Sequence, residues 1–220
     1  MLVNTKQQPI IDKSKLISGC IELNKKIDFQ KMRNEVDMLP SDIWKDERSR
    51  DHADASSCFL KGYPARQQKP SDEREILKSL PYIKTWLASL EYGKLANVLL
   101  AKLKPMGTIL LHIDGSPELL LNTASYFSTT IRIHISIKSN ASVKFYCNNQ
   151  FYKMCEGSLY VINNSALHGV INESTTEDRI HLILDVWPTE EFIEYLAHAK
   201  VMPGYNDAAS FQKILNASKP

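Results

Sequence analysis

Two ionisable side chains stand close together in TILLHIDGS, residues 108–116. One residue separates His112 from Asp114, and alternate residues of a β-strand share a face, so both side chains would point the same way. An imidazole beside a carboxylate can bind a borderline divalent metal ion. The same pair is also common as the polar end of a strand or as a turn cap, and both interpretations stay open at this point.

A third candidate ligand, His168, follows the polar turn in NNSALHGVIN and begins another apolar run. Two histidines and one carboxylate on the rim of a β-barrel form the facial triad that suits non-haem Fe(II), because it leaves three coordination positions open. A hydrogen-bonded histidine at a strand end is the plain alternative for His168.

Two further runs alternate basic and apolar residues. In TIRIHISI, Arg132, His134 and Ser136 share one face and isoleucines occupy the other. In DRIHLILDVW, Arg179 and His181 share a face. A guanidinium at Arg179 could hold a carboxylate through two parallel hydrogen bonds, which a lysine does less selectively. The alternative explanations are a half-exposed strand for TIRIHISI and a surface ion pair for Arg179.

The first half of the chain predicts helices and extended segments that support these residues. Helical spacing of apolar residues runs from 27 to 39 and stops at Pro40. Extended structure and loop are expected from 44 to 69. The segment 70–103 begins with acids suited to a helix N-terminus, and we expect two or three helical pieces in it.

From residue 107 the pattern changes to short runs rich in Ile, Val, Leu, Tyr and Phe between turn residues. Many short strands at close spacing favour an all-β sandwich or barrel. After Trp187, residues 188–199 predict a final helix capped by Thr189. The predicted strands are 108–113, 128–137, 142–147, 150–154, 157–162, 168–172 and 179–187.

Composition limits the class of protein. The 220 residues suit one sizeable domain, and 43% hydrophobic with 24% charged residues is typical of a soluble globular protein. A net charge of +2 gives no electrostatic case for nucleic acid or a membrane surface as a partner. The N-terminus is too polar for a signal peptide, and the four cysteines form no C-x-x-C pair, so a cytoplasmic location is expected.

From Pro105 to Trp187 the chain resembles the catalytic domain of the aspartyl/asparaginyl β-hydroxylase family. These are Fe(II)- and 2-oxoglutarate-dependent dioxygenases, and they include some free-proline hydroxylases. The chain keeps Asp114, whereas some members, including the vertebrate enzyme, lack this carboxylate. It departs from the family at Met106, where glycine is usual, and in a longer link over 116–130. The matching pieces, in the family's order, are KPMGTILLHIDG, IRIHISI, EGSLYVINNSALHGVIN and DRIHLILDVW.

The resemblance implies a mainly β protein with flanking α-helices, built on a double-stranded β-helix, the jelly-roll or cupin-like barrel. It implies a single dioxygenase domain over 1–220. Within it, residues 1–104 would be helical and extended support, 105–187 the barrel core with the metal site, and 188–220 a C-terminal helical segment.

The resemblance also implies roles for individual residues. Arg179 would pair with the distal carboxylate of 2-oxoglutarate, and Arg132 and His134 would lie near its metal-bound end or near the substrate. His181 is a weaker candidate that could line the barrel wall. The implied iron ligands, which form the catalytic set, are His112, Asp114 and His168.

The implied reaction is hydroxylation of an unactivated C–H bond with Fe(II), 2-oxoglutarate and O2, which ascorbate could support. The substrate would be an amino acid, either free and proline-like or an Asp/Asn side chain in a peptide or short protein segment. Arg48, Arg50 and His52 could bind a substrate carboxylate or belong to a solvated charged loop. The alternative function is a non-catalytic cupin-like module that binds a metal or small ligand.

Overall fold

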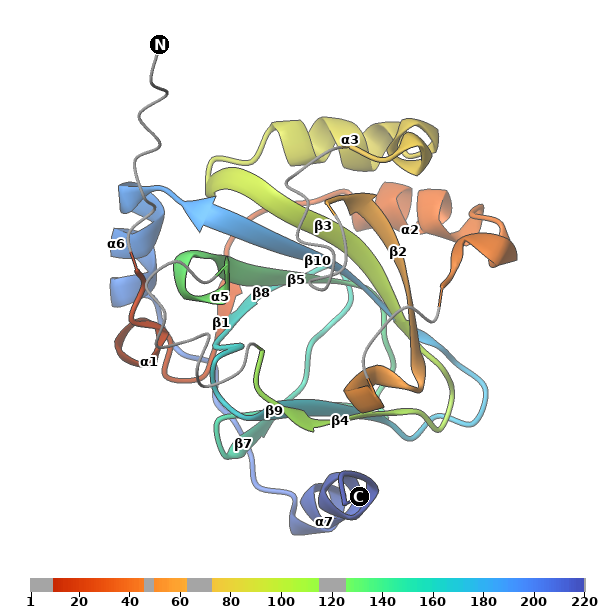
Figure 1. Cartoon of the computed structure of the whole chain (residues 1–220), viewed down its shortest axis with the longest axis vertical. Helices are drawn as coiled ribbons and strands as arrows, with labels where there is room; N and C mark the ends of the chain where they lie inside the picture. Colours follow the sequence, from red (N-terminus) through yellow and green to blue (C-terminus); the bar gives the residue numbers. More distant parts are fainter. Residues whose placement is uncertain (1–9, 46–49, 63–72, 115–125, 220) are drawn as a thin grey trace.

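The computed structural model describes residues 10–45, 50–62, 73–114 and 126–219. Two antiparallel sheets face each other and form a double-stranded β-helix, with helices outside both sheets (Figure 1). The larger sheet has the order β1-β8-β5-β10-β3-β2, and the smaller has the order β4-β9-β6-β7. The mainly β fold with flanking helices predicted from the sequence is confirmed.

The strands of the larger sheet are β1 (Cys20–Leu23), β2 (Ala55–Lys61), β3 (Gly93–Leu103), β5 (Ile131–Lys138), β8 (Leu159–Ile162) and β10 (Arg179–Pro188). Those of the smaller sheet are β4 (Thr108–His112), β6 (Val143–Cys147), β7 (Gln150–Tyr152) and β9 (His168–Asn172). The α-helices are α1 (Lys13–Leu16), α2 (Phe29–Asp37), α3 (Pro81–Ala88), α5 (Tyr126–Thr129), α6 (Glu190–His198) and α7 (Ala208–Ala217). Three short 3-10 helices are η1 (Ser41–Ile43), η2 (Arg50–His52) and η3 (Glu75–Ser79).

The main core lies on the outer face of the larger sheet. The isoleucine face of β5 packs there with apolar residues of α2, α3 and α6, such as Met32, Trp86 and Phe192. The opposite face of β5 points between the two sheets, where the His134 ring lies 5.6 Å from the Phe145 ring of β6. The half-exposed strand considered for TIRIHISI is therefore wrong, because both faces of β5 are covered.

The helical prediction for the end of segment 70–103 is also wrong. Its first part forms η3 and α3, but residues 93–103 form β3, which pairs with both β2 and β10. A central strand covered on both faces carries a near-continuous apolar run, and such a run does not distinguish strand from buried helix. The barrel core therefore does not begin at residue 105, because β1, β2 and β3 belong to the larger sheet and lie before that residue in the chain.

Other local predictions are confirmed. Helix α2 ends before Pro40, and all seven strands predicted after residue 107 are present. The hydroxyl of Thr189 accepts a hydrogen bond from the backbone N–H of Phe192 and caps α6. Met106 adopts a φ of 54°, the left-handed region that glycine enters without strain, which gives a physical reason for the family's usual glycine.

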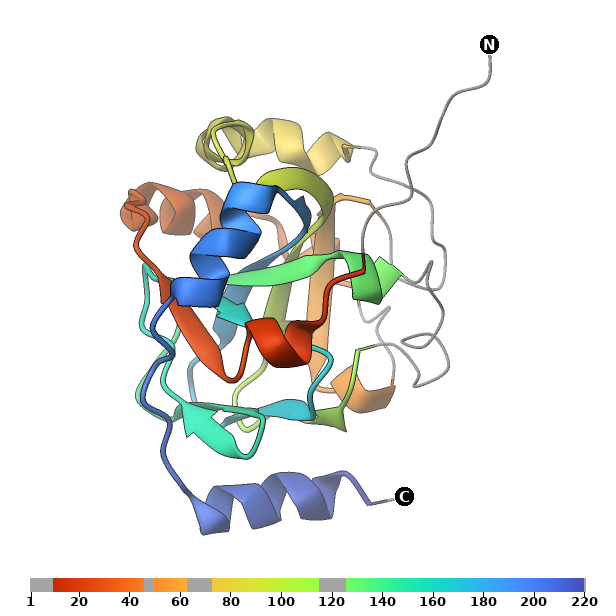
Figure 2. The same cartoon turned by 90° about the vertical axis from the view of Figure 1, so that its left-hand side faces the viewer.

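Helix α7 lies beneath the smaller sheet, on the side away from the larger one (Figure 2). Just after the helix, the Ser218 hydroxyl accepts a hydrogen bond of 3.0 Å from the backbone N–H of Leu111. Lys144 of β6 forms ion pairs with Asp207 and Glu173. The ion pair with Asp207 fixes the start of α7 against β6, and the Ser218 contact holds the edge strand β4, which carries His112, so the C-terminal segment supports the strand that leads into the candidate site.

The described part of the chain contains no helix long and apolar enough to cross a membrane.

We predict that Glu35→Ala lowers the free energy of unfolding by about 1–3 kcal/mol. Helix α3 has no capping side chain of its own. Instead, the Glu35 carboxylate of α2 accepts hydrogen bonds from the backbone N–H groups of Tyr82 (2.6 Å) and Ile83 (3.0 Å). Urea unfolding measures the loss. Glu91→Ala, at an exposed position, is the control and should change stability by less than about 0.5 kcal/mol. Equal stability of the two variants would contradict the cap.

Candidate metal centre and barrel interior

The register of the smaller sheet brings the predicted metal ligands together. His112 at the end of β4 lies directly opposite His168 at the start of β9, and their ring centroids are 4.2 Å apart. Asp114 follows two residues later, and one ligand atom from each of the three side chains lies within 4.8 Å of the others. These three residues, which are at most 56 positions apart in the sequence, thus form one compact group of two imidazoles and a carboxylate. We call His112, Asp114 and His168 the metal group.

Hydrogen bonds to the backbone orient both imidazoles. Nδ1 of His112 lies 2.7 Å from the Leu110 carbonyl oxygen, and Nδ1 of His168 lies 2.9 Å from that of Ala166. A carbonyl oxygen can only accept, so each Nδ1 carries the proton and each Nε2 keeps its lone pair. These lone pairs are next to Asp114, since Nε2 of His112 is 3.7 Å from Oδ1 and Nε2 of His168 is 4.0 Å from Oδ2.

The charge state of the group suits a divalent cation. Burial, together with the nearby His112, lowers the pKa of His168 to about 4, which keeps this imidazole neutral at pH 7. Burial by itself raises the pKa of Asp114, but Arg132 and the two histidines outweigh it and hold the pKa well below its usual value. A neutral imidazole and an ionised carboxylate are the forms that coordinate metals.

Arg132 connects Asp114 to a second buried carboxylate. Its guanidinium contacts Asp114 through one terminal nitrogen. Nε and the other terminal nitrogen donate to the two oxygens of Asp185, at 2.8 and 2.9 Å. Asp185 is the cross-strand partner of Arg132 and also accepts a 2.8 Å hydrogen bond from the Tyr126 hydroxyl. Arg132 thus lies beside the His-Asp-His group and bridges two acids there.

The other predicted cosubstrate residues lie further along the interior face of the same sheet. Arg179 donates a 2.6 Å hydrogen bond to Nδ1 of His181, and Nδ1 of His134 is 3.3 Å from the same atom. Burial and the adjacent guanidinium lower the pKa of both histidines well below the usual value, so both are neutral. The structure therefore brings Arg179, His134 and His181 together, and His181 belongs to this polar cluster as well as to the barrel wall.

Three buried polar atoms on this face have no hydrogen-bond partner among the described residues: Oγ of Ser57, Nε2 of His134 and Nε2 of His181. Ser57 and His181 flank Ala101 in register, on neighbouring strands. Since an unsatisfied buried polar group is unfavourable, three of them on the sheet face that also carries Arg179 fit a polar, anionic ligand bound inside the barrel. The residues present therefore suit both a divalent metal and a carboxylate-bearing cofactor.

The three residues considered for substrate binding have different positions. His52 in η2 is buried, and its ring centroid lies 4.5 Å from that of His112. Arg50 in the same short helix is exposed. Arg48 lies outside the described residues. His52 thus borders the metal group directly, whereas Arg50 is available at the surface beside it.

Sequence reasoning missed four residues of the site. Asp185 shares the strand face of Arg179 and His181, so alternation alone could have identified it. Asn164 lies within the quoted motif NNSALHGV and donates a 3.0 Å hydrogen bond to Oδ2 of Asp114. The other two are Lys13, whose ammonium donates to Asn164, and Tyr126. No local pattern points to them, because their partners are far away in the sequence.

The fold and the His-Asp-His group define a β-helix barrel protein with a candidate metal centre at one end of its interior. Residues 26–189 match the model of the aspartyl/asparaginyl β-hydroxylase family, and the chain belongs to this family. The resemblance predicted from the sequence is therefore confirmed. A search of curated proteins finds no match to the chain.

Among the solved structures of similar fold are two 2-oxoglutarate oxygenase-type enzymes. A 2OG-Fe(II) oxygenase family oxidoreductase from Burkholderia pseudomallei aligns with a TM-score of 0.54 and 12% identity, over 76% of this chain and 84% of that one. A prolyl hydroxylase from Trichoplax adhaerens, in complex with a hypoxia inducible factor oxygen degradation domain peptide fragment, aligns with a TM-score of 0.53 and 10% identity. That alignment covers 79% of this chain and 86% of the hydroxylase. At these identities the likeness supports the double-stranded β-helix fold alone.

We predict that Asp185→Asn lowers the free energy of unfolding by about 3 kcal/mol, because the buried charge of Arg132 loses one of its two carboxylates. Tyr126→Phe removes only a hydroxyl that donates to the same carboxylate, and should lower stability by about 1 kcal/mol. Urea unfolding of the metal-free protein compares the two. If the asparagine variant loses no more stability than the phenylalanine variant, the guanidinium does not depend on the charge of Asp185.

Proposed function

We propose that the protein is an Fe(II)- and 2-oxoglutarate-dependent dioxygenase that hydroxylates an unactivated C–H bond of an amino acid. One observation carries the proposal: a preoriented His-Asp-His group and a buried Arg-His-His cluster share one barrel interior. We further propose that residues 1–220 act as a single catalytic unit. When bound, iron and 2-oxoglutarate would supply, with O2 as the oxidant, the chemistry of C–H hydroxylation, in which one oxygen atom would enter the product and the other would enter succinate as CO2 is released.

The proposed metal ligands are Nε2 of His112, a carboxylate oxygen of Asp114 and Nε2 of His168. The hydrogen bonds of both Nδ1 atoms support this assignment, because they fix the tautomer in which Nε2 can coordinate. Three protein ligands on one side of an ion leave positions for the cosubstrate and for oxygen.

The proposed cosubstrate site is the interior face of β5 and β10. Arg179 would hold the distal carboxylate of 2-oxoglutarate, and His134 and Arg132 would lie near its metal-bound end. Because Arg179 can only donate, Nδ1 of His181 accepts, and the proton of His181 is on Nε2. Nε2–H of His181 and the Ser57 hydroxyl are therefore donors able to contact a bound carboxylate.

The proposed substrate is either a free, proline-like amino acid or an Asp/Asn side chain in a peptide or short protein segment. The prolyl hydroxylase of similar fold, which is bound to a peptide, is a precedent for a peptide rather than a free amino acid as substrate. The position of η2 against β4 supports a substrate approach near His52 and Arg50, where the exposed guanidinium could meet a carboxylate.

The decisive test supplies Fe(II), 2-oxoglutarate and ascorbate and adds a panel of free amino acids and Asp- or Asn-containing peptides. We expect at least one substrate to raise succinate formation and to gain one oxygen atom by mass spectrometry. His112→Ala should abolish both signals, whereas His198→Ala, an exposed histidine on α6, should leave them unchanged. If every substrate leaves succinate at background although the metal binds, the hydroxylase proposal fails in favour of a ligand-binding module.

We predict that Arg179→Lys raises the KM for 2-oxoglutarate roughly 10- to 100-fold, since a lysine keeps the charge but loses the planar pair of donors. Succinate formation at varied 2-oxoglutarate measures the change with whichever substrate the panel identifies. Arg33→Lys, on α2 outside the barrel, is the matched control. A KM equal to that of the control would contradict a cosubstrate role for Arg179.

A further inference from the structure

Lys13 is a lysine in an unusual place. It belongs to the short helix α1, yet only 3% of its surface is exposed, and lysine is among the residues least often buried. Its Nζ donates a 2.6 Å hydrogen bond to Oδ1 of Asn164, which is itself buried. Burial lowers the pKa of Lys13 to about 8. A buried ammonium group destabilises the fold unless a hydrogen bond compensates for its lost hydration.

Asn164 connects this lysine to the metal group. Its Nδ2 donates a 3.0 Å hydrogen bond to Oδ2 of Asp114, and its backbone oxygen accepts from the backbone N–H of Asp114 at 2.9 Å. An amide that donates from one end and accepts from the other has its orientation fixed when both partners are present. The Lys13 ammonium therefore determines which way the Asn164 amide faces.

The two oxygens of Asp114 have different surroundings. Arg132 and Asn164 both donate to Oδ2, and no described residue donates to Oδ1. Oδ1, the oxygen without a donor, lies 3.7 Å from Nε2 of His112, whereas Oδ2 is the oxygen nearer to Nε2 of His168, at 4.0 Å. A carboxylate whose second oxygen is held by two donors binds a metal through one oxygen only, which leaves coordination positions open for other ligands.

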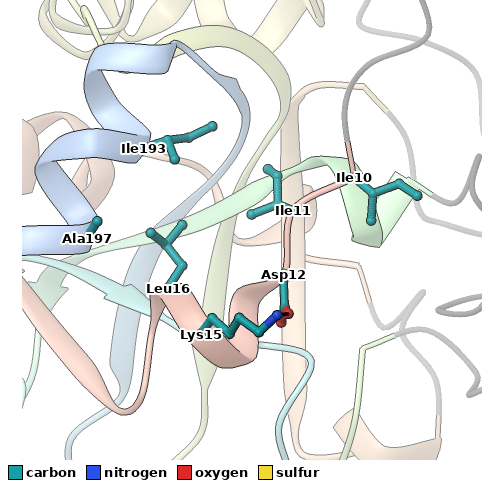
Figure 3. Close-up of a pocket in the computed structure, with 7 residues that line it drawn as sticks. All are labelled: Ile10, Ile11, Asp12, Lys15, Leu16, Ile193 and Ala197. Carbon is teal, nitrogen blue, oxygen red and sulfur yellow. Dashed lines mark ion pairs between the residues drawn. The ribbon is translucent and has the colours of Figure 1, made fainter.

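Helix α1 is anchored on both sides, so it can hold Lys13 in place. On its outer side, Leu16 and the preceding Ile11 pack against the main core, and together with Ile193 and Ala197 of α6 they line a pocket (Figure 3). On its inner side, the backbone oxygen of Lys13 accepts a 3.4 Å hydrogen bond from Asn163. Lys13 also lies outside residues 26–189, the part of the chain that the family model matches.

We infer that Lys13 is a positioning residue: through Asn164 it keeps donors on Oδ2 of Asp114 and turns Oδ1 toward the metal. This inference rests on the proposed metal site. It assigns a role in that site to a helix at the start of the chain and to a residue that does not touch the ion.

The test is a Co(II) titration of the metal-free full-length protein, without 2-oxoglutarate or substrate. Lys13→Met keeps the aliphatic stem and removes the donor, and we expect Co(II) to bind roughly tenfold more weakly or worse. The d–d absorption of bound Co(II), which reports ligand geometry, should change as well. Lys15→Met is the matched control, because Lys15 is exposed on the same helix and pairs only with Asp12 among the described residues. It should match the wild type in both measurements.

A double-mutant cycle tests the route through Asn164. Asn164→Ala should weaken Co(II) binding at least as much as Lys13→Met, and the double variant should be no weaker than Asn164→Ala alone. Additive losses would overturn the route. Urea unfolding of the metal-free variants shows whether Lys13→Met folds. If it does not, Asn164→Ala still tests the inference. In that case, wild-type Co(II) affinity of Asn164→Ala would overturn the inference.

The inference and the dioxygenase proposal fail in different ways. A folded Lys13→Met protein with wild-type Co(II) affinity and spectrum would overturn the role of Lys13 and leave the dioxygenase proposal intact. A wild-type protein that binds Co(II) tightly, with the predicted losses in the variants, but forms no succinate with iron would leave the role of Lys13 intact and refute the dioxygenase.

Discussion

The interior of this barrel depends on the contact between the Asp114 carboxylate and the Arg132 guanidinium. A buried carboxyl group without a cation nearby becomes protonated, and a buried guanidinium without an anion is strongly destabilising. Here the two groups neutralise each other, and Asp185 adds a second carboxylate on the far side of Arg132. Because Asp114 stays ionised in a buried site, it forms with the imidazoles of His112 and His168 a group that could hold a metal ion, rather than a polar strand end.

Strand register turns this charge pair into a site. β4 and β9 place His112 opposite His168, while β5 and β10 place Arg132 opposite Asp185. The first pair comes from the smaller sheet and the second from the larger, so Asp114 meets Arg132 where the two sheets face each other. A shift of either register by one residue would turn one of these pairs out of the interior. The outer packing of α2, α3 and α6 on the isoleucine face of β5 opposes such a shift, since it fixes which face of the strand points inward.

The sequence identified features that repeat with the period of a strand. Alternation in TIRIHISI assigned Arg132 and His134 to one face, and the order of motifs around His112 and His168 indicated the family. β3 was mistaken for helix because a strand covered on both sides shows no alternation. Lys13 gave no signal at all: its partner Asn164 is 151 residues away, and nothing local distinguishes it from the exposed Lys15. Contacts between distant segments are set by the packing of the sheets, which a local pattern does not contain.

Arg179 explains why the interior can carry so many histidines without excess charge. Burial lowers the pKa of both His181 and His134, and the Arg179 guanidinium near the two rings acts in the same direction. The 2.6 Å hydrogen bond from Arg179 then fixes the tautomer of His181, so that its Nε2 carries a hydrogen and has no hydrogen-bond partner among the residues that the structure describes. A fixed cation surrounded by neutral, oriented donors attracts an anion while adding no further positive charge that would repel a metal ion nearby. The polar cluster and the metal group are therefore electrostatically compatible within one barrel, which is what a site for a chelating dicarboxylate requires.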